Sequence, residues 1–230
     1  MDEWQALFGQ VQGIVRAGAS LQTALEQVTK FALDNPGIFD EPDYWRGGQA
    51  HAFGPAFDTL VGWAKQGLES LEPKSGWEFM LLDLGDCPET FRLYSPGGQA
   101  QMSQQKMKAL LSTELIVGPS DLERCFSSDV ADPFAELFGP ARVERTEHHV
   151  SELGDKFLNW TTGSEDADFH GNNGYLLWLV LGSLALTVPL QNEAYRKGIL
   201  KGRESLYLLS GFEEIFCPLV TLTAGGMSYE

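Results

Sequence analysis

The sequence predicts an α+β fold in which helices dominate, because three kinds of segment stand out along its 230 residues. Over much of the chain apolar residues recur at three- and four-residue spacing, which indicates amphipathic helices. Residues 77–84 and 90–94 are strand-like runs on either side of a short turn, which is typical of a β-hairpin. Residues 175–190 are almost wholly apolar, as in a buried helix. We therefore expect one predominantly helical domain, with a small antiparallel β-hairpin or sheet around residues 77–94.

The N-terminal third of the chain predicts three helices. Apolar residues at helical spacing run through residues 4–15 and again through residues 21–31, where Ser20 is placed to cap the second helix. A third apolar stripe covers residues 57–71. These helices make residues 1–75 a candidate N-terminal lobe within a single globular domain that covers residues 1–230.

The rest of the chain predicts an irregular connection and further helices. Residues 34–56 are rich in proline, glycine and aromatic residues, so we expect a packed connection there. Residues 102–115 predict a helix, and the apolar run 175–190 predicts another. The last run, residues 206–222, also predicts a helix, because its apolar residues recur at helical spacing: Leu206, Leu209, Phe212, Ile215, Phe216 and Leu219.

The overall charge excludes one class of function. The chain has 32 acidic and 16 basic residues, a net charge of −16. Such a surface repels phosphate backbones, so we expect no nucleic-acid binding. Three cysteines, an odd number without a C-x-x-C pair, are not a disulfide framework. The first residues carry acids rather than a basic leader, and together these features predict a cytoplasmic protein.

The apolar run 175–190 raises the alternative of a membrane span. As a helix its sixteen residues would reach about 24 Å at about 1.5 Å per residue, short of a hydrocarbon core of roughly 30 Å. Acidic residues before it and basic residues after it imitate the charge pattern of a membrane helix. We expect a buried core helix and no membrane association.

Catalytic, nucleotide and metal motifs are absent from the sequence. None of the patterns G-x-S-x-G, H-E-x-x-H, G-x-x-x-x-G-K-[ST] and G-x-G-x-x-G occurs. If residues 144–152 are helical, Glu144, His148 and Glu152 share one face, but this spacing matches no strong metal motif. A solvated polar face explains it better.

The segment that starts at Asp166 begins like a calcium-binding EF-hand loop. His170 then stands where an oxygen ligand is expected, and Leu177 stands where a bidentate glutamate is needed. We therefore expect an ordinary turn before a helix there, and the sequence predicts no metal and no cofactor.

The acidic excess is concentrated in residues 121–169. This stretch holds twelve acidic and four basic residues, so half of the net charge lies in it. One interpretation is a solvated surface that maintains solubility. The other is an electrostatic docking face for a basic protein partner. The candidate partner-binding residues are Asp121, Glu123, Asp129, Asp132, Glu136, Glu165, Asp166 and Asp168.

A basic cluster follows the apolar run. Within eight positions it contains four of the sixteen basic residues: Arg196, Lys197, Lys201 and Arg203. They form a candidate anion-binding site for a phosphate or carboxylate. The alternative is a solvated turn whose charges balance nearby acids.

A protein without catalytic motifs and with a strongly acidic segment is best explained as a binding protein. The leading hypothesis is an inhibitor or immunity-type protein whose acidic face docks on a basic partner such as a nuclease or toxin domain. One alternative is an unrecognised hydrolase or transferase with a histidine, cysteine or carboxylate site, for which His170 is the first candidate. Another is a subunit or scaffold of a larger assembly.

Overall fold

The computed structural model describes most of the N-terminal third and almost all of the C-terminal quarter of the chain. The described residues are 2–39, 50–71, 73, 75–83, 90–94, 105, 108, 109, 148, 149, 172–212 and 215–229. In chain order the elements are α1 (Asp2–Arg16), α2 (Leu21–Asp34), α4 (Ala50–Ser70), β1 (Gly76–Asp83), β2 (Thr90–Tyr94), β3 (His148–His149), α9 (Asn172–Thr187), the 3₁₀ turn η2 (Val188–Gln191), α10 (Glu193–Leu200), β4 (Arg203–Phe212), β5 (Ile215–Thr223) and β6 (Gly226–Ser228).

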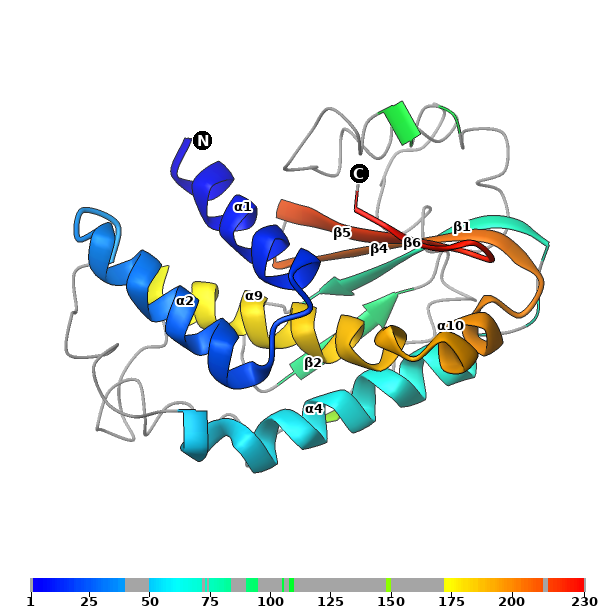
Figure 1. The fold of residues 1–230 in the computed structure, drawn as a ribbon, viewed down its shortest axis with the longest axis horizontal. Helices are drawn as coiled ribbons and strands as arrows, with labels where there is room; N and C mark the ends of the chain where they lie inside the picture. Colours follow the sequence, from blue (N-terminus) through cyan, green and yellow to red (C-terminus); the bar gives the residue numbers. More distant parts are fainter. Residues whose placement is uncertain are drawn as a thin grey trace.

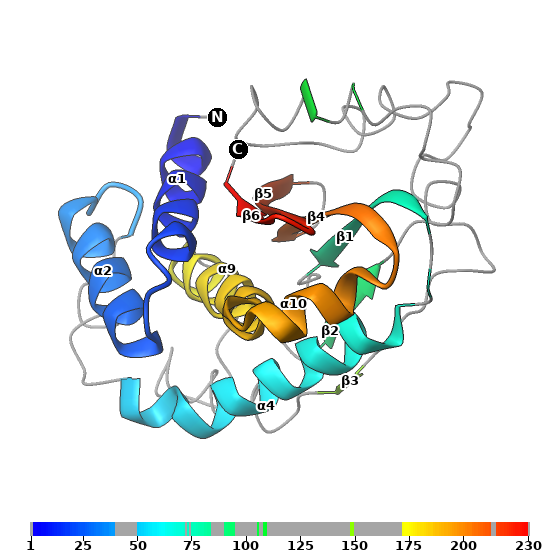
Figure 2. The ribbon, with the colours of Figure 1, turned by 45° about the vertical axis from the view of Figure 1, so that its right-hand side comes forward.

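These elements confirm the predicted α+β class. The described part is 59% helix and 25% strand, so helices dominate as expected. The predicted hairpin is present, because β1 and β2 pair antiparallel with Leu82 opposite Leu93. It belongs to a larger sheet than predicted, since four further strands extend it in the order β3-β2-β1-β4-β5-β6 (Figure 1; β3 is labelled in Figure 2).

The sheet is mixed because β1 and β4 run parallel. Phe79 lies opposite Tyr207 and Leu81 opposite Leu209 in this pairing, while the other neighbouring strands pair antiparallel. Parallel strands cannot be joined by a tight turn and need a crossover connection. Along the chain, α9 and α10 lie between these two strands, so the parallel pairing joins the N-terminal and C-terminal parts of the fold.

Helix α9 is the central element of the helical layer. It contacts α1, α2 and α4 on one side and strands β1 and β4 on the other, and Figure 2 shows it between α1, α4 and the sheet. Its described side chains are buried all round, which explains why the segment is almost wholly apolar. The prediction of a buried helix is confirmed, and among the described residues no helix is long and apolar enough to cross a membrane.

The N-terminal helices follow the prediction, with one correction. Ser20 caps α2, because its Oγ accepts a hydrogen bond of 3.2 Å from the backbone N–H of Thr23. Helix α4 begins at Ala50, so residues 50–56 are helical and not part of an irregular connection. Gly54 and Pro55 disfavour a helix locally, and the packing of α4 against α9 overrides this preference.

The prediction of a helix over residues 206–222 is wrong, because this run forms β4 and β5. The two strands pair antiparallel, with a bulge where Leu208 faces Val220 and Leu209 faces Pro218. Along β4, Leu206 and Leu208 join the core shared with the helices, whereas Tyr207 and Leu209 lie outside that core and are equally buried. A strand buried on both faces has a nearly continuous apolar sequence, which hides the two-residue period of a strand.

Candidate functional site

The predicted partner-binding residues lie outside the part of the chain that the structure describes. This holds for Asp121, Glu123, Asp129, Asp132, Glu136, Glu165, Asp166 and Asp168, and also for His170. The segment that begins like an EF-hand loop is described from Asn172 on, where it forms the start of α9. Of the acidic stretch 121–169, only His148 and His149 are described. The acidic face therefore stays a prediction.

The described residues are nearly balanced in charge, with ten acidic and nine basic side chains.

The basic cluster is fully described, and local structure separates its four members. Asn192 caps α10 by accepting a hydrogen bond of 3.0 Å from the backbone N–H of Tyr195. Arg196 and Lys197 then lie on this helix. Lys201 follows in the left-handed conformation, with φ of 45°, and turns the chain toward β4.

The first two cations bind acceptors close to them in sequence. Arg196 donates from Nη1 to the carbonyl oxygen of Leu190 over 2.9 Å. Lys197 forms an exposed ion pair of 2.6 Å with Glu193, one helical turn away. The hydrogen bond and charge of Lys197, with a smaller effect of the Arg196 charge, lower the pKa of the Glu193 carboxyl.

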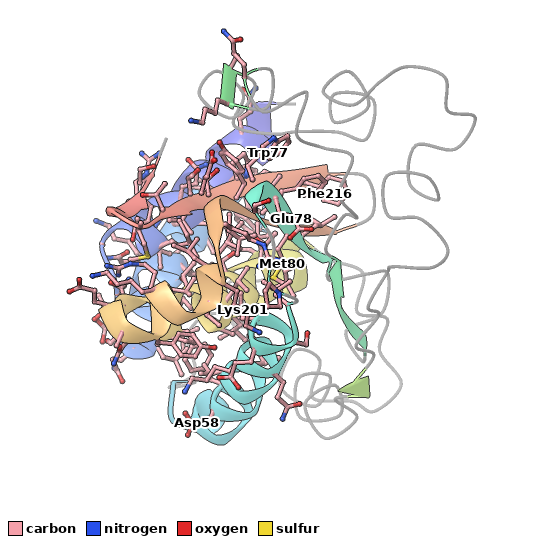
Figure 3. All side chains as sticks on the ribbon, turned by 90° about the vertical axis from the view of Figure 1, so that its right-hand side faces the viewer. Asp58, Trp77, Glu78, Met80, Lys201 and Phe216 are labelled. Atoms are coloured by element: carbon pink, nitrogen blue, oxygen red, sulfur yellow. The ribbon has the colours of Figure 1, made fainter. Side chains whose placement is uncertain are left out.

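Lys201 links the end of α10 to the end of α4. Its Nζ donates to the carbonyl oxygens of Glu69 and Leu71, and the second of these bonds measures 2.6 Å. The carbonyl groups at a helix C-terminus lack helical partners and favour a cation, so Lys201 caps α4 from a distant part of the sequence. Figure 3 shows Lys201 where α10 approaches α4.

Tyr195 makes a second link between the same two helices. Its hydroxyl lies 3.5 Å from the carbonyl oxygen of Lys65, and the Lys65 ammonium lies 5.5 Å from the centre of its ring. Burial, and then the charge and hydrogen bond of Glu69, raise the pKa of the Tyr195 hydroxyl. The phenol is therefore neutral and acts as a docking contact.

Arg203 is the buried member of the cluster. Its Nε and Nη2 each lie 2.7 Å from Oε2 of Glu78, and its Nη1 donates to the carbonyl oxygen of Leu200 over 3.3 Å. Both charged side chains are almost completely buried. The four cations thus have separate acceptors on η2, α10, α4 and β1, and binding of an anion by them stays a prediction.

His148 is the described member of the set Glu144, His148 and Glu152. Together with His149 it forms strand β3, which pairs with β2 at Phe91 and Thr90. The condition that residues 144–152 are helical is therefore not met at His148, while Glu144 and Glu152 lie outside the described residues. Within the described residues no group of three potential ligands is placed to hold a metal ion.

Of the three cysteines, Cys217 is the one that lies in the described part of the chain, and its surroundings make it unreactive. It is fully buried on β5, and its Sγ lies 3.6 Å from the carbonyl oxygen of Pro218 and 4.0 Å from that of Phe8. Burial raises the pKa of the thiol. Since the thiolate is the nucleophile, a thiol held neutral serves packing rather than catalysis. Cys217 is buried and packed in the core, but it lies on a strand and not on the predicted helix.

One polar feature was not predicted from the sequence. Tyr207 is completely buried, and its hydroxyl has no hydrogen-bond partner, alone among the buried side-chain polar atoms of the described residues. Its ring meets that of Trp77 edge-on, with centroids 5.7 Å apart and an angle of 86° between the rings. The two aromatic residues become neighbours only through the pairing of β1 with β4, for which the sequence contains no local signal.

Comparison with known proteins identifies no relative of the chain. It matches no protein-family model, no curated protein and no solved structure.

Proposed function

We propose that this chain is an acidic partner-binding protein of the inhibitor or immunity type, which docks a basic protein through residues 121–169. A single observation carries the proposal: residues 121–169 hold twelve acidic and four basic residues, so half of the net charge of −16 lies in this one stretch of the sequence. A surface that only maintained solubility would distribute acids over the whole molecule. Segregation is what an electrostatic recognition element requires.

The scaffold supports this role by being well packed. Its core contains side chains from α1, α2, α4, α9 and the sheet. Lys201 adds hydrogen bonds to the end of α4, and Arg203 adds an ion pair with Glu78 of β1. In the sequence, residues 121–169 lie between β2 and α9, and two residues of this stretch, His148 and His149, pair with β2 as strand β3. The stretch contains twelve acidic residues.

The binding step would follow from long-range attraction. A concentrated negative charge accelerates the encounter with a basic partner, typically by about 10- to 1,000-fold, and the gain falls steeply with ionic strength. At roughly 0.1 M salt the screening length is about 10 Å, so distant charges contribute little. Apolar contacts formed after the encounter then determine the lifetime of the complex.

The test compares two charge-reversal variants with the unaltered protein. In the first, Asp129, Asp132 and Glu136 are changed to lysine. In the matched control, the exposed acids Glu26, Asp34 and Asp58 of α2 and α4 are changed to lysine, which alters the net charge by the same amount. Each tagged protein captures partners from its native lysate at low and at high salt. Mass spectrometry identifies the captured protein, and stopped-flow mixing measures its association rate.

We expect one stoichiometric basic protein that the first variant loses and the control retains. Its association rate with the unaltered chain should fall by about tenfold or more as salt is raised. If both variants lose the partner equally, net charge alone governs binding and the proposed docking face is wrong. A partner that binds equally fast at low and high salt, or an eluate without a specific protein, would overturn the proposal.

A further inference from the structure

We draw no further inference here: the strongest candidate, the aromatic face of the sheet on which the fully buried Tyr207 hydroxyl lacks a hydrogen-bond partner beside Trp77, carries nothing, because nothing in the described part of the chain shows what covers it.

Discussion

Arg203 and Glu78 form a buried ion pair that joins the first residue of β4 to β1, in the N-terminal half of the chain. Two guanidinium nitrogens of Arg203 lie 2.7 Å from the same carboxylate oxygen, and the two side chains are only 2% and 5% exposed. The residues are 125 positions apart in sequence. The pair therefore lies at the junction where β4 meets β1, which is the one parallel pairing of the described strands.

Replacing one partner of this pair should destabilise the protein strongly. Arg203→Met leaves the Glu78 carboxylate buried without its cation, and breaking a buried pair typically costs about 3–5 kcal/mol. The free energy of unfolding, measured with urea, should fall by this amount. The double variant Arg203→Met/Glu78→Met should recover much of the loss, because it leaves no buried charge behind.

The exposed pair of Lys197 and Glu193 provides the control for that measurement. Both side chains are more than half exposed, although their distance is equally short at 2.6 Å. Lys197→Met should therefore leave the free energy of unfolding almost unchanged, because solvent screens an exposed pair. If Arg203→Met and Lys197→Met lowered the free energy of unfolding equally, the burial of the Arg203–Glu78 pair would not be the cause of the loss.

Two buried serine hydroxyls, one on α9 and one on β4, should contribute to stability as a pair and not independently. The Oγ atoms of Ser183 and Ser210 lie 2.8 Å apart, and both residues are completely buried. Ser183→Ala or Ser210→Ala alone leaves one hydroxyl unpaired, at a cost of about 1–3 kcal/mol. The double variant removes both groups and should cost less than the sum of the single changes. A double-mutant cycle by urea unfolding measures this difference, and strict additivity would contradict the hydrogen bond.

Removing the hydroxyl of Tyr207 should not destabilise the protein. A buried polar group without a partner costs about 1–3 kcal/mol, so Tyr207→Phe should leave the free energy of unfolding unchanged or raise it. Tyr195→Phe is the comparison, because the Tyr195 hydroxyl has an acceptor on α4 and its loss should cost about 0.5–1.5 kcal/mol. A loss above about 1 kcal/mol in Tyr207→Phe would mean that the hydroxyl has a partner in solution, such as an ordered water.

Cys217 should make the protein less stable in alkali. Burial raises the pKa of its thiol in the folded state, so the folded protein keeps the proton while an unfolded cysteine ionises above about pH 8.5. The stability contributed by the neutral thiol is therefore complete below that pH and is lost as the pH rises above it. The free energy of unfolding should fall more steeply than in Cys217→Ala, by up to about 1.4 kcal/mol per pH unit.

The measurement is urea unfolding of both proteins between pH 7 and pH 10 under reducing conditions. The other two cysteines, Cys87 and Cys125, are present in both proteins, so their ionisation cancels in the comparison. Equal slopes above pH 8.5 would show that the thiol ionises in the folded protein, and that its burial is not maintained in solution.

Local signals account for the parts of the fold that were predicted correctly. Ser20 and the apolar stripe after it predicted α2, and the turn between two strand-like runs predicted the hairpin of β1 and β2. The apolar run that became α9 lacked a polar face, which excluded a surface helix. In each case the information lies within a few residues, so neither the partner element nor the topology was needed.

The wrong predictions came from segments whose conformation depends on distant residues. In residues 206–222 the apolar positions fit a helical spacing and a doubly buried strand equally well, and only pairing with β1 and packing against α9 selects the strand. The contacts of the basic cluster also depend on distant residues, and its binding of an anion stays a prediction. In sequence it is one group, but its members bind separate acceptors. The acceptors of Lys201 and the carboxylate bound by Arg203 lie more than 120 positions away.

Composition and short-range periodicity are enough to predict the α+β class, the central buried helix and the uneven distribution of charge. The strand order, the two faces of the sheet and the distant acceptors of Lys201 and Arg203 follow only from the packing of the folded chain. Burial and long-range hydrogen bonds depend on which segments meet, and segments far apart in the sequence contain no local signal of that meeting.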